Sequence, residues 1–342
     1  MSEQKKIRFA VVGCGHIGKR HIAEIQANPK AELLAVCDVK EKSEIEDFGV
    51  PYFNSLDELL LSDLAFDVVS ICTPNGMHAS QSLLALQNCN VLVEKPMALS
   101  VSDANSMIQK EKESGNQLFC VMQNRYSPPA IWLKSLIENN SMGEIYMVHL
   151  NCFWNRDDRY YNSANWRGTI DLDGGTLFTQ FSHFIDILFH LFDNIKVENV
   201  MLNDFNHSQT TDFEDSGIIS FSLEENAIGN MKFSTAVFDK NMESSITVIG
   251  KKGSVKVGGQ YMEKIEYCHI ENYEIPKLSK SNKANDYGKF KGSANNHHFV
   301  IENVIETLKG NTTKDATPKQ CLEVIAFIED IYKRRKIEST II

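Results

Sequence analysis

The fold of this chain is decided by the stretch Arg8-Phe9-Ala10-Val11-Val12-Gly13-Cys14-Gly15-His16-Ile17-Gly18. An apolar run ends there in a loop with three glycines, which opens onto a helix. Asp38 follows 20 residues after Gly18, at the end of a second apolar run over residues 32–37. This is the spacing of a βαβ unit that binds a dinucleotide. The alternative is a strand-to-helix turn in an α/β fold that binds no ligand.

Each glycine of this loop has a separate task in a dinucleotide site. Gly13 permits the tight turn, Gly15 lets the backbone approach a pyrophosphate, and Gly18 lets the helix pack on the strand. The helix N-terminus offers N–H groups and the positive end of its dipole to the phosphates. Asp38 is expected to bind the ribose hydroxyls, which favours NAD, although Lys40 nearby can pair with the 2′-phosphate of NADP. The predicted cofactor contacts here are Gly13, Gly15, His16, Ile17, Gly18 and Asp38.

Length and composition indicate a two-domain enzyme of ordinary globular type. The chain has 342 residues, of which 42% are hydrophobic and 23% charged, and its net charge is -10. The negative charge argues against nucleic-acid binding, and the basic run at 333–336 reads as a solvated last helical turn. No apolar run is long enough for a membrane span, and a signal-peptide core is absent. The eight cysteines are scattered without a CxxC pair, so we expect a cytoplasmic protein without disulfides or structural zinc.

Residues 1–125 alternate between strands and helices. Strands are predicted over 8–12, 32–37, 51–53, 66–72, 91–93 and 117–122, with helices between them, among them a short one over 41–48. This alternation predicts an NAD-binding Rossmann domain with a doubly wound parallel sheet. Ligands bind at the carboxyl ends of such strands, where the loops at 73–78, 94–97 and 123–126 belong. These loops supply the other predicted cofactor contacts: Thr73, Pro74, Asn75, His78, Glu94, Lys95 and Gln123.

Residues 126–342 change character and predict a second domain of the α+β class. Helices are expected over 129–139 and 176–192. Several alternating segments follow a strand at 144–151, namely 216–222, 229–235, 245–249, 254–257 and 265–269. Runs of strands after a βαβ half indicate a mainly antiparallel or mixed sheet. The polar stretch 273–292 is predicted as a loop, and 296–309 and 318–334 as closing helices.

Two residues have the chemistry of a dehydrogenase. Lys95, in Glu94-Lys95-Pro96 at a strand end, can hydrogen-bond a substrate hydroxyl and stabilise its alkoxide; Pro96 makes a cis peptide possible. His183 shares a helical face with Thr179 and Asp186 and can take the alcohol proton. The alternatives are a surface lysine in a turn and a core histidine. No metal site is predicted, because His183 and Asp186 have no third ligand at metal spacing, and His297-His298 reads as a helix-surface or interface pair.

Arginines interleaved with aromatic residues predict an anionic, ring-bearing substrate. Arginine binds carboxylate or phosphate with two hydrogen bonds, and aromatic faces accept sugar or base rings. The alternative is an ion-paired loop, because Asp157 and Asp158 adjoin Arg156 and Arg159. The predicted substrate contacts are Lys95, Arg125, Tyr126, Arg156, Tyr160, Trp166, Arg167, Thr179 and His183.

Together, the glycine loop, Glu94-Lys95-Pro96 and the segment from Gly174-Gly175 to His183 and Asp186 resemble the Gfo/Idh/MocA oxidoreductases. The resemblance implies NAD(P)-dependent oxidation or reduction of sugars and cyclitols at CH–OH groups. It also implies a large open C-terminal sheet that mediates a homodimer or homotetramer. The motif lysine corresponds to Lys95 and the motif histidine to His183. Many members carry an aspartate four residues before that histidine, where this chain has Thr179.

The stretch from Asn155 to Asp186 is similar to one subgroup, the 3-dehydrogenases of UDP-N-acetyl-2-amino-2-deoxyglucuronate. That similarity implies a small-molecule nucleotide-sugar substrate, a 3-keto product, and a role in bacterial surface polysaccharide (lipopolysaccharide) synthesis. It also implies that 2-oxoglutarate can reoxidise the bound NADH. Two alternatives stay open: a cyclitol or simple-sugar dehydrogenase of the same family, and a non-catalytic NAD-binding sensor, which Thr179 favours.

Overall fold

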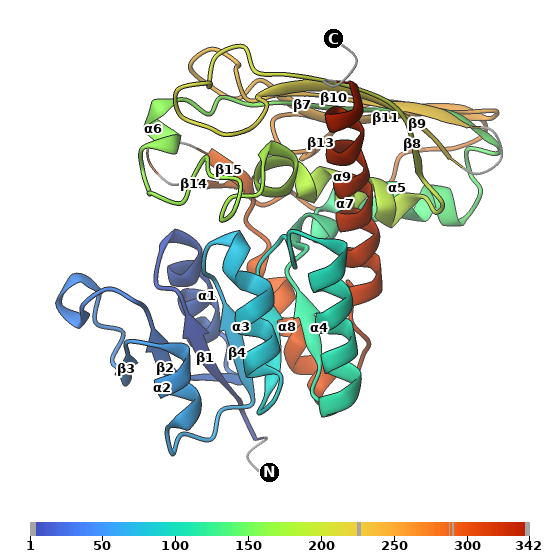
Figure 1. Ribbon diagram of the computed structural model, residues 1–342. Coiled ribbons are helices and arrows are strands. Elements are labelled where there is room, and N and C mark those ends of the chain that lie inside the picture. The colour runs from blue at the N-terminus through green and yellow to red at the C-terminus, as the bar shows by residue number, and fades with distance from the viewer. Residues whose placement is uncertain (1–4, 224–226, 287, 289–290, 339–342) are drawn as a thin grey trace. The chain divides into compact units, whose positions relative to one another are not determined.

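The computed structural model describes residues 5–223, 227–286, 288 and 291–338. These residues group into two compact units (Figure 1). The first contains the chain up to Met122 and, in addition, His297–Ile325; the second contains Gln123–Asn296 and the residues from Ala326 onward. The division therefore differs from a single boundary after residue 125, because the chain returns to the first unit at His297.

Six parallel strands form the sheet of the first unit, in the order β3-β2-β1-β4-β5-β6. They are β1 (Ile7–Val12), β2 (Ala31–Cys37), β3 (Tyr52–Phe53), β4 (Val68–Ile71), β5 (Asn90–Val93) and β6 (Leu118–Cys120). β1 lies in the middle, and its Phe9, Ala10 and Val11 are completely buried. The strand order reverses between β1 and β4, and doubly wound sheets bind their ligands at this point. The predicted Rossmann sheet is confirmed.

One helix of the first unit has both a side-chain cap at its start and a glycine at its end. The helices of this unit are α1 (His16–Ala27), α2 (Leu56–Leu61), α3 (His78–Ala85), α4 (Val101–Ser114) and α8 (His297–Leu308). Ser100 accepts a hydrogen bond from the Asp103 N–H at 3.0 Å and caps α4, which ends at Gly115 with φ +74°. The helix predicted over 41–48 is only a 3₁₀ turn, Lys42–Glu44, closed by a reciprocal capping box between Glu41 and Glu44. A second 3₁₀ turn covers Asn75–Met77.

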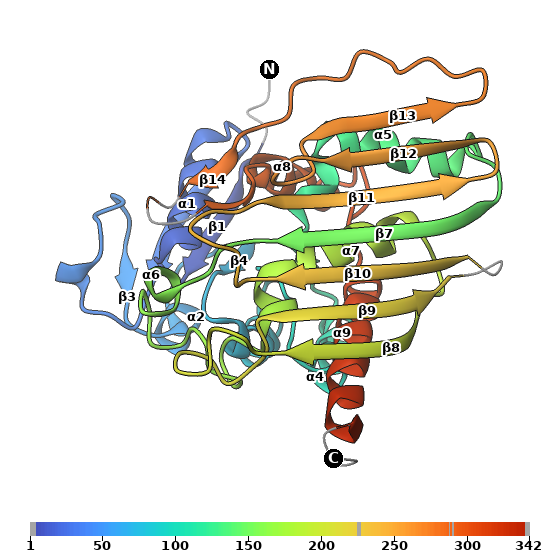
Figure 2. The same cartoon turned by 90° about the horizontal axis from the view of Figure 1, so that it is seen from above.

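A seven-stranded sheet forms the second unit, in the order β13-β12-β11-β7-β10-β9-β8 (Figure 2). Its strands are β7 (Ile145–Phe153), β8 (Lys196–Asn203), β9 (Ser216–Ser222), β10 (Ile228–Ser234), β11 (Glu243–Gly250), β12 (Gly253–Gly258) and β13 (Lys264–Ile270). All neighbours are antiparallel except β7 and β10, which are parallel. The predicted open, mainly antiparallel sheet is confirmed. Edge strand β8 was not predicted, because its sequence mixes charged and apolar residues without a regular alternation.

Helices of the second unit cover one face of this sheet. They are α5 (Pro128–Glu138), α6 (Asp158–Tyr161), α7 (Ser182–Leu191) and the end of α9 (Pro318–Glu338), with a 3₁₀ turn at Gln123–Tyr126 and a π-helical turn at Leu177–Phe181. The covered face carries buried residues such as Val148 and Leu150 of β7. On the opposite face, Ile228 of β10 pairs with Met147 of β7, and Ile228 is 55% exposed. The sheet therefore has one open face.

The predicted loop at 273–292 contains part of a small hairpin. It consists of β14 (Ala284–Asp286) and β15 (Lys291–Ala294), which pair antiparallel. The loop prediction is therefore wrong at these residues, whereas residues 287, 289 and 290 lie outside the described part of the chain. All eight cysteines are free thiols. Among the described residues, no helix combines the length and apolarity that a bilayer crossing requires.

Candidate active site

The loop after β1 can be made only with glycine at two positions. Gly13 has φ +91°, and a Cβ there would lie 2.7 Å from the carbonyl oxygen of Cys72. At Gly18, a Cβ would lie 1.7 Å from the carbonyl oxygen of Gly13. Helix α1 can therefore approach β1 and β4 only because Gly18 has no side chain.

Gly15 meets a different requirement, because a Cβ built there would contact nothing within 4 Å. It caps α1 without a side-chain hydrogen bond, and the first turn of α1 contains no acidic residue. His16 is exposed and Ile17 half-buried beside it. Space next to the backbone and N–H groups at a positive helix end suit a pyrophosphate. This loop therefore fits the phosphates of the predicted cofactor.

Asp38 follows β2 directly and is tied to the glycine loop. Its Oδ2 accepts a hydrogen bond from the Cys14 N–H at 2.7 Å, and its Oδ1 accepts one from the Lys40 N–H at 3.1 Å. Its side chain remains partly exposed. These bonds fix the carboxylate at the strand end, where such a residue binds adenosine ribose hydroxyls.

The loops after β4 and β5 are joined by a buried histidine. His78 Nδ1 lies 2.7 Å from the Pro96 carbonyl oxygen, and its Nε2 lies 2.9 Å from the Thr73 carbonyl oxygen. The bond between Lys95 and Pro96 is cis, as the sequence made possible. Because His78 is 1% exposed and its two ring nitrogens lie within hydrogen-bond distance of a carbonyl oxygen in each loop, it holds the two loops together. Of the other predicted contacts, Asn75 is buried, whereas Thr73, Pro74 and Lys95 are partly exposed.

Behind Lys95, the first unit contains a buried cluster around Glu94. Glu94 Oε1 accepts a hydrogen bond from His21 Nε2 at 2.9 Å, and Glu94 Oε2 accepts one from the Lys95 N–H at 3.1 Å. His297 Nε2 lies 3.5 Å from Glu94 Oε1, and His21 Nδ1 lies 2.7 Å from Ser70 Oγ. Burial raises the pKa of Glu94, but the two histidines outweigh it and hold that pKa well below its usual value.

The position of His297 corrects the prediction of a surface or interface histidine, because this residue is only 1% exposed. Its partner Glu94 lies about two hundred residues earlier, and helical periodicity carries no signal for such a pairing. His21, Glu94 and His297 also have the donor types of a metal site. However, the hydrogen bonds to Glu94 already give the cluster a structural role next to the Lys95 peptide.

His183 lies at the start of α7 and is 5% exposed. Its Nε2 is 3.3 Å from the side-chain Nε2 of Gln123. This contact orients the ring of His183, and an imidazole held in place in this way can act as a general base when its reacting nitrogen is unprotonated.

The sequence spacing predicts a regular helix before His183, but the structure differs there. Leu177–Phe181 forms a π-helical turn, which contains one more residue per hydrogen-bonded ring than an α-turn. Within it, the Thr179 hydroxyl donates to the main-chain oxygen of Asp173 at 2.8 Å and also contacts its carboxylate. Asp173 is 1% exposed, and its Oδ2 accepts a hydrogen bond from the Gly168 N–H at 2.9 Å. The Thr179 hydroxyl is therefore bonded to a buried aspartate that precedes the helix.

Arg125 and Asp186 form a buried ion pair. The Nε and terminal nitrogen of Arg125 donate to the two carboxylate oxygens at 2.9 and 2.6 Å. The exposed fractions of the side chains are 3% and 1%. Asp186 is therefore used as the partner of Arg125 rather than as a metal ligand with His183. Tyr126 follows at the end of the 3₁₀ turn and is partly exposed.

Two further arginines lie on aromatic rings. The Arg167 guanidinium is 4.0 Å from the ring centre of Tyr160 and 4.8 Å from that of Trp166. Arg156 is 4.6 Å from the ring centre of Trp154 and 5.1 Å from that of Tyr160. The sequence interleaving of arginines and aromatics therefore corresponds to one cation–π cluster.

The two arginines differ in burial. Arg156 is 2% exposed and donates to neutral oxygens of Gln180 at 2.7 Å, of the Asn155 main chain at 2.6 Å and of Asn241 at 3.2 Å. Burial lowers its pKa to about 10. Arg167 and Trp166 are both partly exposed. The sequence could not distinguish the two arginines, because the Asn241 contact joins segments far apart in the chain. Arg159 is exposed and forms an ion pair with Asp157, which the alternative of an ion-paired loop had predicted.

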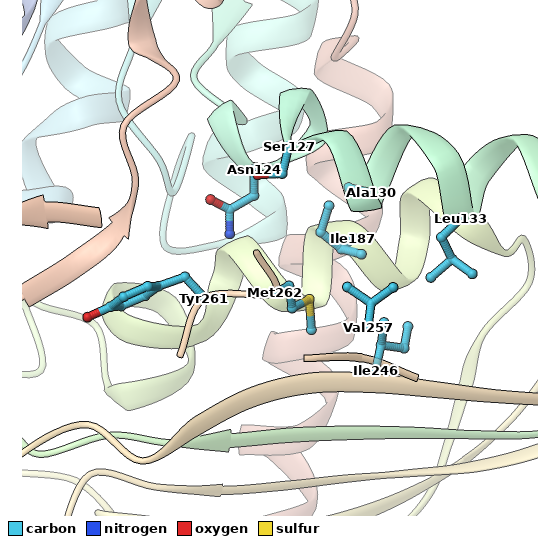
Figure 3. A pocket seen from close by; sticks show the side chains of 9 residues that line it. All are labelled: Asn124, Ser127, Ala130, Leu133, Ile187, Ile246, Val257, Tyr261 and Met262. Carbon is cyan, nitrogen blue, oxygen red and sulfur yellow. The ribbon is translucent and has the colours of Figure 1, made fainter. Parts of the chain in front are cut away.

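A pocket in the second unit lies between α5 and the covered face of the sheet (Figure 3). It is lined by Asn124, Ser127, Ala130, Leu133, Ile187, Ile246, Val257, Tyr261 and Met262. Its cavity volume is about 10 Å³, which holds no more than a water molecule. None of the predicted substrate contacts lines it, and it is too small for a sugar.

Comparison with known proteins identifies both halves of the chain. Residues 7–122 match the NAD-binding Rossmann fold of the GFO/IDH/MocA oxidoreductase family, and residues 134–340 match its C-terminal alpha/beta domain. A relative among curated proteins is glucose-6-phosphate 3-dehydrogenase of Bacillus subtilis. It is 24% identical over 82% of this chain and 83% of its own length.

Two solved structures are more similar. The WlbA dehydrogenase of Bordetella pertussis, in complex with NADH and UDP-GlcNAcA, is 31% identical with a TM-score of 0.84, covering 96% of each chain. The WlbA dehydrogenase of Chromobacterium violaceum, with the same two ligands, is 30% identical with a TM-score of 0.85. That match covers 97% of this chain and 94% of the other.

Proposed function

The chain belongs to the Gfo/Idh/MocA oxidoreductases and is an NAD-dependent dehydrogenase of CH–OH groups, and from this premise we propose its substrate. It oxidises the C3 hydroxyl of UDP-N-acetylglucosaminuronate to a ketone. The observation that carries the proposal is its 31% identity, over 96% of the chain, with a dehydrogenase crystallised with NADH and UDP-GlcNAcA. The Bacillus subtilis relative is also named as a 3-dehydrogenase of a sugar, although its named substrate, glucose 6-phosphate, carries no nucleotide.

The proposed reaction divides between two residues of this chain. His183, whose Nε2 lies 3.3 Å from the side-chain nitrogen of Gln123, takes the proton of the C3 hydroxyl. Lys95 donates a hydrogen bond to the same oxygen and stabilises its developing negative charge. NAD, held by the glycine loop and Asp38, would supply the acceptor for the hydride of C3. The C3–H and O–H bonds break, the C=O double bond forms, and the proton remains on His183.

Binding of the nucleotide sugar is proposed to use the exposed part of the cation–π cluster. Arg167 is partly exposed over Tyr160 and Trp166, so it offers a cation beside aromatic faces. A UDP-uronate carries a pyrophosphate and a carboxylate, and arginine binds either group with two hydrogen bonds. Arg125 and Arg156 are assigned a supporting role, because both are buried and hydrogen-bonded within the unit.

The test is a turnover assay with purified protein and NAD. UDP-N-acetylglucosaminuronate should produce the absorbance of reduced nicotinamide, whereas the uncharged UDP-N-acetylglucosamine should be a poor substrate. Addition of 2-oxoglutarate tests whether bound NADH is reoxidised in place. Equal oxidation of glucose, inositol and the UDP-uronate would contradict the nucleotide-sugar proposal.

A simple-sugar dehydrogenase is the second candidate, and the Bacillus subtilis relative favours it. A phosphorylated hexose also offers an anion for Arg167, so glucose 6-phosphate belongs in the same assay. Preference for the hexose phosphate over the UDP-uronate would decide for this candidate. Turnover of any sugar would eliminate the non-catalytic NAD-binding sensor.

We also propose that two or four copies associate through the open face of the sheet. Ile218 of β9 lies beside Met201 of β8, and these residues are 46% and 61% exposed. Ile228 of β10 is exposed on the same face, farther along the sheet, and no helix of the unit covers this face. Exposed apolar surface of this kind marks interfaces. Replacement of Ile218 and Ile228 by lysine should convert the oligomer to monomers in size-exclusion chromatography with light scattering.

A further inference from the structure

The loop between β8 and β9 brings three potential metal ligands together. Asp204, His207 and Asp215 each offer a ligand atom, and these atoms all lie within 4.8 Å of one another. The three residues belong to the second unit and are separate from the residues assigned to the redox reaction. Asp204 directly follows β8, and Asp215 directly precedes β9, so two strand ends fix the outer ligands of the cluster.

The centre of this cluster is buried. The side chains of His207 and Asp215 are 2% and 1% exposed. Within the described residues, neither ring nitrogen of His207 makes a hydrogen bond, and the same holds for Asp215 Oδ1. Buried polar atoms nearly always have a partner. Two adjacent side chains with unsatisfied atoms therefore point to a ligand.

The relation between His207 and Asp215 has the geometry of two ligands of one ion. His207 Nδ1 lies 3.2 Å from Asp215 Oδ2, but the ring is out of line for a hydrogen bond to it. Two atoms that each lie about 2.1 Å from a metal, at a tetrahedral or octahedral angle, are roughly 3.0–3.4 Å apart. From this geometry we propose that Asp204, His207 and Asp215 bind one divalent transition-metal ion.

The donor set indicates the class of ion. One imidazole and two carboxylates suit zinc or manganese, whereas magnesium and calcium prefer oxygen ligands alone.

Asp204 is the ligand of the cluster that solvent can reach. It is only partly buried, and its Oδ1 accepts a hydrogen bond from the His207 N–H at 2.8 Å. Asp215 Oδ2 accepts hydrogen bonds from the N–H groups of Phe205 and Asn206 at 3.0 and 2.7 Å. These bonds hold both carboxylates toward the ring of His207, and an ion can enter past Asp204.

The ion would stabilise the loop between β8 and β9, and this loop is hydrogen-bonded to the segments that carry the cation–π cluster. Asp212, in the same loop, donates its N–H to the Gly168 carbonyl oxygen at 2.8 Å. The Asp215 carbonyl oxygen accepts the Thr235 N–H at 2.7 Å, and the Thr235 carbonyl oxygen accepts the Arg156 N–H at 2.8 Å. Arg156 belongs to the cation–π cluster, and Gly168 follows its Arg167 in the chain. A metal at His207 would therefore stabilise the backbone next to both arginines.

The experiment uses untagged full-length protein stripped with chelator and then titrated with zinc chloride or manganese chloride. We expect one ion per chain by calorimetry and elemental analysis, together with a rise in melting temperature. His207→Gln and Asp204→Asn should weaken binding by more than about 100-fold, because loss of an outer partner alone costs about 10- to 100-fold. Both variants keep a polar side chain at the substituted position. Asp204→Asn also keeps the side-chain oxygen that accepts the His207 N–H.

Asp212→Asn is the matched control, since it lies in the same loop outside the cluster and should bind metal as the wild type does. No stoichiometric binding by folded wild-type protein would overturn the proposal and leave a His207–Asp215 ion pair only. Equal binding by wild type and His207→Gln would place the ion elsewhere and overturn it as well. Because neither measurement uses a sugar, the result is independent of the proposed function.

Discussion

Asp186 binds Arg125 through both of its carboxylate oxygens, at 2.9 and 2.6 Å, and both side chains are almost completely buried. The pair joins helix α7 to the 3₁₀ turn that carries Gln123. His183 lies one turn before Asp186 on α7, and Gln123 lies two residues before Arg125. The ion pair therefore fixes the spacing of the two segments whose side chains meet at His183 Nε2.

Removing the carboxylate should destabilise the second unit. Asp186→Asn leaves a buried guanidinium without its counter-charge, which costs about 3–5 kcal/mol in the free energy of unfolding. Urea denaturation followed by circular dichroism measures this loss. Asp158→Asn, on the exposed first turn of α6, should change the unfolding free energy by less than about 0.5 kcal/mol. Equal effects of the two substitutions would contradict a structural role of the pair.

Lys95 and His183 should each be needed for turnover but not for cofactor binding. Lys95→Met should lower kcat by about 10²-fold or more through loss of a donor to the developing alkoxide. His183→Asn should have a similar effect. Both variants should still bind NADH in a fluorescence titration, because the glycine loop is unchanged; only Lys95→Met, which removes one predicted cofactor contact, should lower the affinity. Near-normal kcat in either variant removes that residue from the mechanism, and loss of folding indicates a structural role instead.

Arg167 and Arg156 should respond differently to truncation. Arg167→Ala should raise KM for the UDP-uronate about ten- to a hundredfold, since a charge-assisted hydrogen bond contributes roughly 1.5–3 kcal/mol. Affinity for NAD should stay the same. Arg156→Ala should instead lower the melting temperature, because Arg156 is buried and hydrogen-bonded to Gln180 and Asn241. A wild-type KM in Arg167→Ala would exclude Arg167 from substrate binding.

Asp38 should determine the preference for NAD over NADP. Its carboxylate is fixed by the N–H groups of Cys14 and Lys40, and it repels a 2′-phosphate. Asp38→Ala should narrow the ratio of the two dissociation constants, and Lys40→Ala, as the companion variant, should not weaken NAD binding. Tighter binding of NADP than NAD by the wild type would overturn this assignment.

The buried His21–Glu94 pair should make the free energy of unfolding fall as the pH becomes alkaline. Burial lowers the pKa of His21, but Cys72 and Glu94 raise it to about 10, whereas the unfolded residue releases its proton near about 6.5. The stabilisation is complete below about pH 6.5 and is lost as pH rises toward 10. The unfolding free energy should fall by up to about 1.4 kcal/mol per pH unit in this range.

Urea unfolding at successive pH values measures this slope. His21→Gln is the control, because it retains a donor for Glu94 without a titrating proton, and its slope should be shallower. The acidic limb has the opposite sign: Glu94 has a lowered pKa, so its contribution is present above about pH 4.5 and is lost on acidification. Identical alkaline slopes in wild type and His21→Gln would show that His21 is neutral in the folded protein.

Features encoded by local spacing could be predicted from the sequence. The glycine loop, Asp38 and the alternation of strands and helices predicted the parallel first sheet, which the strand order confirms. Each depends on residues within about one βαβ unit, where chain geometry limits the outcomes. The same holds for the helix that carries His183 and for the interleaved arginines and aromatic residues.

Contacts between distant segments could not be predicted. The sequence interpretation placed His297 on a surface, whereas it is buried beside Glu94. It treated Arg125 and Arg156 like Arg167, but Asp186, Gln180 and Asn241 occupy the first two. Arginine forms hydrogen bonds of this kind with protein groups and with ligands alike, and which of them it meets depends on how the segments pack together. Such information is absent from the periodicity of any one segment.

The π-helical turn at Leu177–Phe181 has a consequence for comparing this chain with its relatives. A wide turn accommodates one additional residue without breaking the helix, so the sequence before His183 is shifted by one position relative to a regular α-helix. Counting four residues back from His183 reaches Thr179, but that side chain points in a different direction from its counterpart on an unbroken helix. The residue of a relative that corresponds to Thr179 is therefore found by superposition of the two structures rather than by counting back from the histidine.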